Sequence, residues 1–263
     1  MNYDDLLKAH LKYGTNSENI IAYKGYGKIL ENVIIAPWWG HNMFDNYNFK
    51  VEQVGERVFN LSKDNVSFSF IELKQIGAPA IIDYILSLGV TKCKNLLFLG
   101  SVGSLDNNIN IGDIVIPKYS ICGDGTSRYL NKNLEDELFK KEYPSKDLTD
   151  KIIDILNKKS INYHYVPNFS VDSIFLQFYH LDKILDAGAK VIEMETASIF
   201  KCKDILNINI SALFSVSDST IKNKSLYSGR TDEEKANNKK TRYEVIPNII
   251  IDLFKKESSN DNI

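Results

Sequence analysis

The sequence predicts an α/β fold: a single domain in which a twisted mixed β-sheet is flanked by helices. Short apolar runs, such as residues 95–99 (NLLFL) and 208–216 (INISALFSV), are typical of strands that are covered on both faces. Segments with helical periodicity, such as 196–205, alternate with these runs. No internal repeat and no long linker divides the 263 residues. We therefore expect one domain over residues 1–263.

In the N-terminal half, three leucines on one face predict a first helix, and we assign residues 1–30 to an N-terminal helical extension. The turn at Lys63-Asp64-Asn65 separates two alternating segments and predicts an antiparallel pair. The next helix has Pro79 near its beginning and Gly89 at its end. The expected elements are a helix over 4–13, strands over 32–37, 49–61 and 66–73, and a helix over 77–88.

In the C-terminal half, strands and helices continue to alternate, and Pro247 is expected to kink the last helix. The polar segment 219–232 directly follows a predicted strand, so it could act as a lid. The last residues, 257–263, are expected to form a frayed tail. The expected elements are strands over 95–99, 113–121, 163–171, 190–192 and 208–216, and helices over 134–159, 181–187, 196–205 and 232–256.

The composition excludes several classes of protein. The formal net charge is −2, so no electrostatic argument favours nucleic acid or a membrane surface as a partner. No apolar run reaches the ~18 residues of a transmembrane helix, and the N-terminus does not have the pattern of a signal peptide. The three widely spaced cysteines form neither a metal-ligand pattern nor a disulfide framework. A cytoplasmic location is therefore expected.

Two short segments stand where predicted strands end, which is where ligands gather in open α/β sheets. Residues 100–104 (GSVGS) contain two glycines and two hydroxyls, which suit a turn whose backbone N–H groups hold an anion. Residues 215–218 (SVSD) place Asp218 at the end of another predicted strand. Taken alone, the first segment is also explained as a tight turn, and the second as an Asx-turn or a helix N-cap.

Two carboxylates interrupt the apolar segment 191–200 (VIEMETASIF). In an extended chain, Glu193 and Glu195 point to one face and Met194 to the other. A buried carboxylate is costly unless it is paired, and this segment offers no lysine or arginine beside the two acids. A helix that begins at Glu195 would stabilise one of the acids but not both. The neighbouring 2′ and 3′ hydroxyls of a ribose would supply the missing donors.

The order of these segments resembles the nucleoside phosphorylase family, which includes purine nucleoside phosphorylases, uridine phosphorylases and related nucleosidases. The resemblance extends from about residue 70 to residue 218, more than half of the chain. It implies the fold of that family, homo-oligomers such as dimers or hexamers, and no metal or organic cofactor. The matching segments are 77–79 (GAP), 99–104 (LGSVGS), 112–117 (GDIVIP), 123–128 (GDGTSR), 170–172 (SVD), 192–195 (IEME) and 215–218 (SVSD).

The resemblance also implies roles for residues around the sugar and the base. Glu195 would hold the ribose hydroxyls, Met194 would pack against the sugar, and Glu193 would be a supporting acid. An aromatic side chain would stack on the base, and Phe175 suits this role, one position later than in the family. The residues expected against the base are Ile174, Phe175 and Ser217.

Asp218 matches the acid that protonates the base nitrogen N7 in the members that act on purines. A basic helper often follows this acid in the family; Lys235 is the best match, and Arg230 is a rival. Uridine phosphorylases resemble this chain less, since their pyrimidine-reading Gln and Arg would fall near Phe178 and His180. A purine-type base is therefore favoured.

The resemblance is weakest around the expected phosphate. Family phosphorylases place an arginine two residues before the glycine–serine segment, where this chain has Phe98, and another in the turn after the first strand, where it has none. Losing two charge-assisted hydrogen bonds could weaken phosphate binding by ~10²–10⁴-fold. The expected phosphate-binding residues are Gly100, Ser101, His41 and Arg57.

Three functions remain open at this stage. The first is a phosphorylase that transfers the ribosyl group of a purine nucleoside to inorganic phosphate. The second is a nucleosidase that uses water, although the acid that activates water in such relatives is replaced by Trp38-Trp39-Gly40. These tryptophans either line the site or pack in the core. The third is a nucleoside-binding protein without catalysis. Phosphorolysis is favoured because Ser101 and the glycines remain, while Glu195 and Asp218 speak against the third.

Overall fold

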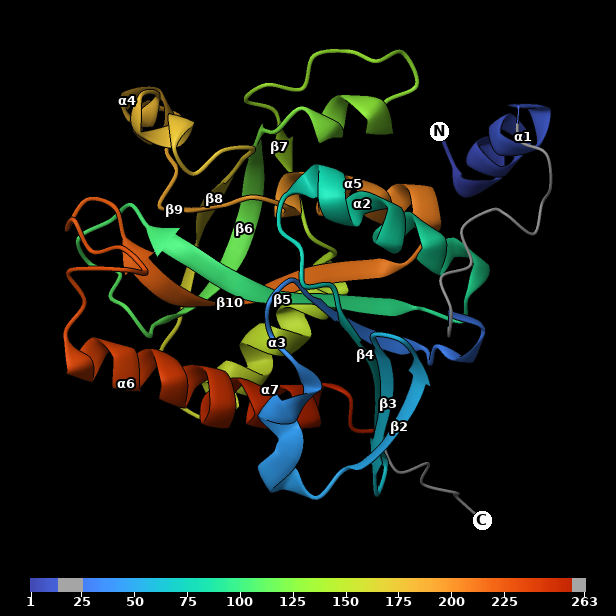
Figure 1. The fold of residues 1–263 in the computed structure, drawn as a ribbon, viewed down its shortest axis with the longest axis horizontal. Coiled ribbons are helices and arrows are strands. Elements are labelled where there is room, and N and C mark those ends of the chain that lie inside the picture. Colours follow the sequence, from blue (N-terminus) through green and yellow to red (C-terminus); the bar gives the residue numbers. More distant parts are fainter. Residues whose placement is uncertain (14–25, 257–263) are drawn as a thin grey trace.

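A ten-stranded mixed sheet forms the centre of the structure, a computed structural model that describes residues 1–13 and 26–256 (Figure 1). The strands are β1 (Asn32–Ala36), β2 (Lys50–Gly55), β3 (Val58–Lys63), β4 (Val66–Glu72), β5 (Asn95–Ser104), β6 (Ile114–Gly123), β7 (Lys141–Glu142), β8 (His164–Val171), β9 (Val191–Glu193) and β10 (Asn209–Ser219). The α-helices are α1 (Tyr3–Tyr13), α2 (Ala78–Leu86), α3 (Lys146–Lys158), α4 (Leu181–Asp186), α5 (Thr196–Leu206), α6 (Asp232–Lys240) and α7 (Ile246–Leu253).

The sheet closes on itself around β5, which pairs with β1, β9 and β10. The order is β10-β6-β8-β9-β5-β1-β4-β3-β2, and β10 also pairs with β5, so that β5, β9, β8, β6 and β10 form a ring. Both parallel pairs, such as β5–β10, and antiparallel pairs, such as β6–β10, occur. The predicted mixed α/β sheet is therefore confirmed.

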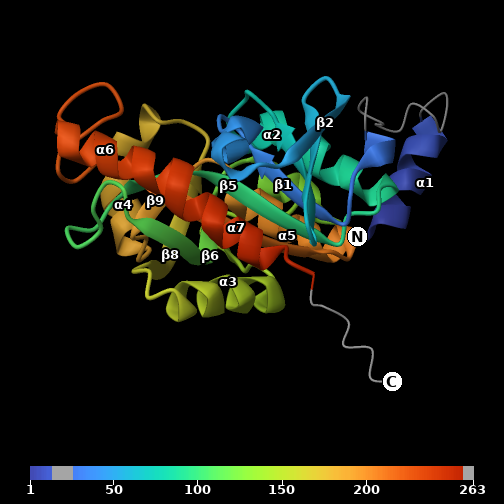
Figure 2. The ribbon, with the colours of Figure 1, turned by 90° about the horizontal axis from the view of Figure 1, so that it is seen from below.

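Helices cover both faces of the sheet, which explains the continuous apolar runs. In β5, Leu96 and Phe98 belong to the core cluster that also contains residues of α2 and α5, whereas Leu97 and Leu99 belong to the cluster with α3 and α7. Successive side chains of a strand point to opposite faces, so a strand buried on both sides needs apolar residues at every position. Figures 1 and 2 show α2 and α5 on one side of the sheet and α3, α6 and α7 on the other.

Four elements differ from the sequence-based expectation. Strand β5 continues to Ser104, so the segment GSVGS is part of a strand and not a loop. The expected strand 49–61 is a hairpin, β2 and β3, which turns around 55–57. Of the expected helix 134–159, only α3 is helical, and the part before it contains β7. The C-terminal helix is interrupted by a π-helical turn, Thr241–Val245, just before Pro247, which stands in the first turn of α7.

The N-terminal helix α1 lies against the body of the protein through Tyr3 and Leu6, which pack on the cluster of α2 and α5. Residues 14–25 of the expected extension and the expected tail 257–263 lie outside the described residues. None of the helices in the described chain combines the length and the apolar character needed to cross a lipid bilayer.

Candidate active site

A cavity of about 370 Å³ lies beside the carboxyl ends of β5 and β10. The segment 220–227, which follows β10, forms part of its wall, so the predicted lid segment does border the site. The residues that matter for the chemistry and line the cavity are Ser101, Gly103, Met194, Glu195, Ser217 and Asp218.

Parallel pairing of β5 with β10 brings the two sequence motifs together. Ser215 is in register with Ser101, and Asp218 is in register with Gly103. The register shifts between Val216 and Asp218, so Ser217 is an extra residue in β10. Such a bulge bends the strand and redirects the side chain that follows it, a device that is common next to active sites. Asp218 consequently lines the cavity, although it lies within a strand that is otherwise almost wholly buried.

Gly103 provides the room that Asp218 occupies. A Cβ atom at position 103 would stand 2.8 Å from Asp218 Oδ2 and 3.2 Å from Ile192 Cγ2. The glycine is thus required by the close approach of a carboxylate, and not by the tight turn that the sequence pattern favoured.

We expect the substitution Gly103→Ala to displace the Asp218 carboxylate and to lower kcat/KM for the substrate of this cavity by about tenfold or more, because a ~1 Å error in the position of a reacting group is costly. Overpacking should also lower the free energy of unfolding by ~1–3 kcal/mol. Steady-state kinetics and urea unfolding check both values. Gly27→Ala is the matched control, since a Cβ atom there meets nothing within 4 Å. Unchanged kinetics in Gly103→Ala would contradict this role.

Glu195 is a buried acid, 6% exposed, at the N-cap position of α5. Its Oε1 accepts a hydrogen bond from the Gly77 N–H at 2.6 Å, and its Oε2 accepts one from the Met194 N–H at 3.3 Å. No ion pair joins it to a lysine or arginine of the described residues. Burial and then the Glu193 carboxylate raise the pKa of Glu195 well above its ordinary value. The acid therefore lacks strong donors in the free protein.

Glu193, in contrast, already has a full set of donors. Its Oε1 accepts from Asn168 Nδ2 at 2.7 Å and from Ser170 Oγ at 2.5 Å, and its Oε2 accepts from the N–H groups of Glu195 and Thr196 at 2.8 Å each. These last two donors are the N-cap and the first residue of α5, so Glu193 caps the helix that begins beside Glu195. This arrangement fits the expected supporting role.

Asp218 is a largely buried carboxyl group with a hydroxyl and a guanidinium beside it. Burial raises the pKa of Asp218 above its ordinary value, although the Ser217 hydroxyl and the Arg230 guanidinium act to lower it. Ser217 Oγ donates to Asp218 Oδ1 at 2.5 Å. Arg230 Nη1 donates to the Ser217 carbonyl at 3.2 Å, which places a cation next to this acid. A raised pKa is a property of general acids.

Comparison with known proteins decides the family. The profile of the phosphorylase superfamily matches residues 46–248, more than half of the chain. The chain belongs to the phosphorylase superfamily. Two DeoD-type purine nucleoside phosphorylases are similar to it: that of Hahella chejuensis, 26% identical over 145 residues, and one of Streptococcus pneumoniae, 25% identical over 151 residues. These matches span 54% and 56% of this chain and only 60% and 61% of those relatives.

Solved structures of the phosphorylase superfamily share the fold. Uridine phosphorylase from Vibrio fischeri superposes with a TM-score of 0.72 at 16% identity, over 94% of this chain and 100% of that chain. Purine nucleoside phosphorylase from Toxoplasma gondii, in complex with immucillin-H, gives the same TM-score and identity over 90% and 96%. The predicted fold and family are thus confirmed, and purine and pyrimidine enzymes resemble it equally in structure.

Several residues that the superfamily resemblance pointed to do not line the cavity. Lys235 lies on exposed α6, where its ammonium is 3.0 Å from Asp232, and it is not among the residues that line the cavity. Arg230, the rival, is placed beside Asp218 instead. On the base side, Ile174 and Phe178 line the cavity, whereas Phe175 is 87% exposed on the adjacent short turn.

Of the residues expected to bind phosphate, some line the cavity and others do not. Gly100 and Ser101 line the cavity. His41 does not; its Nδ1 lies 2.6 Å from Glu72 Oε1, and its ring stacks on Phe59. Arg57 is turned to the backbone, since its Nη1 donates to the Leu73 carbonyl at 2.6 Å.

For three contributors to the site, sequence reasoning gave either no role or two alternatives. Gly77, matched only as part of a helix start, has a φ of +87° and donates its N–H to Glu195. Ser170 was matched only as part of the segment 170–172 (SVD) and Asn168 was not singled out, yet both donate hydrogen bonds to Glu193. Trp38 and Trp39, for which two interpretations were open, both line the cavity, although Trp39 is also part of the core.

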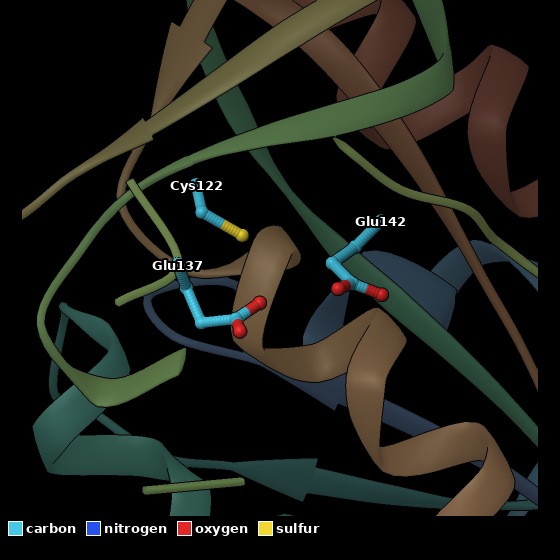
Figure 3. Close-up of side chains that lie close together, drawn as sticks. All are labelled: Cys122, Glu137 and Glu142. Atoms are coloured by element: carbon cyan, nitrogen blue, oxygen red, sulfur yellow. The ribbon is translucent and has the colours of Figure 1, made fainter. Parts of the chain in front are cut away.

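One group of potential metal ligands was found among the described residues, away from the cavity: Cys122, Glu137 and Glu142 (Figure 3). The ammonium of Lys201 lies 2.9 Å from Glu137 and 3.0 Å from Glu142, so a cation of the chain already occupies the space between these acids. Burial raises the pKa of the Cys122 thiol to about 12, which opposes formation of a metal-binding thiolate. We interpret this group as a buried ion-pair network.

Proposed function

We propose that this protein cleaves the N-glycosidic bond of a purine-type nucleoside and transfers the ribosyl group to inorganic phosphate. The observation that carries the proposal is the pair of acids in one cavity: Glu195, which is buried and accepts from the backbone N–H groups of Gly77 and Met194, and Asp218, with a raised pKa. An unpaired buried carboxylate destabilises the free protein, and a ligand that donates two hydroxyl hydrogen bonds would remove this cost.

The proposed reaction follows from what each acid can do. As the bond between C1′ and the base nitrogen N9 breaks, positive charge develops on the sugar and negative charge on the base. Asp218 gives its proton to N7 of the departing purine, which is worth about 10²–10⁴-fold in rate. Glu195 accepts hydrogen bonds from the 2′ and 3′ hydroxyls of the ribose, which holds C1′ in place, and Met194 packs against the sugar. A phosphate oxygen then bonds to C1′.

Further roles in this proposal are assigned from position. Ser101, with the backbone of Gly100, lies where the phosphate would bind on the strand next to Asp218. Arg230 would act as the basic helper in place of Lys235, because its guanidinium influences Asp218 directly. Ile174, Phe178 and Ser217 would contact the base.

Transfer to water is a second candidate function, because Phe98 occupies a position where family phosphorylases carry an arginine. Phe98 is fully buried in the core of α2 and α5, and so it cannot be a phosphate ligand. A nucleosidase would need the same two acids but no site for phosphate.

Release of the free base from inosine, adenosine and uridine, measured with and without phosphate, tests the proposal. Release of hypoxanthine or adenine only in the presence of phosphate is the expected result. Release at the same rate without phosphate would identify a nucleosidase. Binding of inosine without release of base under either condition would identify a non-catalytic nucleoside-binding protein, and faster release from uridine would overturn the purine assignment.

A further inference from the structure

Inorganic phosphate, the proposed acceptor of the ribosyl group, needs a positive charge near its part of the cavity. The arginines of the chain are Arg57, Arg128, Arg230 and Arg242. Arg57 donates a hydrogen bond to the carbonyl of Leu73, directly after β4, and Arg128 is 3.6 Å from the Asp136 carboxylate. Arg230 lies beside the proposed general acid. This leaves Arg242, to which the sequence pattern gave no role.

Arg242 lies against the turn that follows β1. Its Nη2 donates to the Trp38 carbonyl at 3.3 Å, and its guanidinium carbon lies 5.0 Å from the centre of the Trp39 ring and 5.1 Å from that of Tyr243. Trp38 and Trp39 are wall residues of the cavity, together with Ser101. One side of the guanidinium is therefore connected to the cavity wall through a peptide group and an indole ring.

The charge of Arg242 is not neutralised by the described part of the chain. No ion pair joins it to a carboxylate there, and its Nε is buried without a hydrogen-bond partner. Burial lowers the pKa of Arg242 below its ordinary value, as expected for a half-buried cation without an anionic partner. Such a charge is costly unless an anion comes close, and a phosphate in the cavity would be that anion.

The helix that carries Arg242 is fixed at the same edge of the sheet as Ser101. Asn238 Nδ2 donates to Ser215 Oγ and to the Val216 carbonyl, at 2.8 Å each, and Ser215 is in register with Ser101. Thr241 Oγ1 donates to the Gly112 carbonyl at 2.6 Å. Arg242 follows directly, within the π-helical turn Thr241–Val245, and π-turns inside helices are frequent at functional sites.

We propose that Arg242 is the positioning cation of the acceptor subsite: it holds the turn of Trp38 and Trp39 in place and supplies the positive potential that retains inorganic phosphate beside Ser101. This inference rests on the proposed phosphorolysis and names the residue that compensates for the missing arginines. Arg242 does not touch the phosphate; it acts through the Trp38 peptide and the field across the cavity wall.

Calorimetric titration of inorganic phosphate and, separately, of inosine into the whole protein tests the inference. We expect Arg242→Gln to weaken phosphate binding about tenfold or more, because it removes a positive charge from the wall of the cavity, and to change inosine binding less than about twofold. Arg242→Lys should keep much of the phosphate affinity, because it keeps the charge. Lys240→Gln, which removes an exposed charge two residues earlier, is the matched control and should bind both ligands like the wild type.

Each outcome decides between the inference and the function on which it rests. The inference would be overturned by unchanged phosphate affinity in Arg242→Gln, or by a wild type that does not bind phosphate. Equal losses of phosphate and inosine affinity would also overturn it, because they would reveal a structural role for Arg242. A wild type that binds phosphate through Arg242 but releases hypoxanthine without it would contradict phosphorolysis and leave the inference standing. Thermal unfolding of each variant shows whether it is folded.

Discussion

Glu195→Gln is expected to abolish tight nucleoside binding and, at the same time, to stabilise the free protein. A neutral amide accepts hydrogen bonds from the ribose hydroxyls less strongly than a carboxylate and leaves one hydroxyl without an acceptor, which should weaken inosine binding by ~10²–10⁴-fold. The amide oxygen can still accept from the Gly77 N–H. Calorimetric titration of inosine measures the loss.

The stabilising effect of Glu195→Gln has a defined pH dependence. Because the pKa of Glu195 is raised by folding, the native state binds a proton more readily than the unfolded chain, in which the pKa is about 4.3. Between that value and the raised pKa, stability of the wild type falls as pH rises, and above the raised pKa the full penalty is present. The Tm difference between Glu195→Gln and the wild type should therefore be near zero at about pH 4 and grow towards pH 8 and above.

Glu52→Gln is the control for this experiment, since it makes the same chemical change at an exposed position on β2. Its Tm should follow the wild type at every pH. A Glu195→Gln variant that is less stable than the wild type at alkaline pH, or that binds inosine as tightly, would show that the acid is already satisfied without a sugar.

Asp218→Asn is expected to lower kcat/KM for inosine by ~10²–10⁴-fold, because the asparagine cannot give a proton to N7. For 7-methylinosine, whose methylated N7 already carries the positive charge that protonation would create, the loss should be less than about tenfold. The difference between the two substrates isolates proton transfer from binding. Steady-state kinetics with both substrates on the same enzyme preparations measures it.

The pH profile provides a second test of Asp218. A general acid must be protonated, so kcat/KM for inosine should fall as pH rises through the raised pKa of Asp218. The same fall should be absent for 7-methylinosine. Equal losses for both substrates in Asp218→Asn would remove Asp218 from the acid role and leave it a structural position.

The sequence alone was sufficient for the fold class because the short apolar runs of β1, β5 and β10 are typical of strands covered on both faces and alternate with segments of helical periodicity. It was also sufficient to single out Glu195 and Asp218, since acids inside apolar segments have few structural explanations. The strand limits were less accurate. Gly100–Ser104 looked like a loop because glycine and serine disfavour strands, but pairing with β10 overrides that local preference.

What the sequence could not predict depends on contacts between distant segments. The position of Asp218 in the cavity follows from the bulge at Ser217 and the absent side chain of Gly103, and neither has a local sequence signal. Lys235 matched the basic helper by its distance along the chain, yet the loop before α6 leaves Arg230 next to the acid. Arg242 is far from β1 in sequence, and only the docking of the C-terminal helix brings it to the cavity wall.

We infer that the neighbouring hydroxyls of a ribose are the natural partners of the Glu195 carboxylate. A crystal structure of the protein with bound inosine tests it most directly. We expect the 2′ and 3′ oxygens within hydrogen-bond distance of the two Glu195 carboxylate oxygens, with N7 of the base next to Asp218. A sugar bound elsewhere, or a Glu195 that contacts a lysine or arginine in the complex, would contradict it.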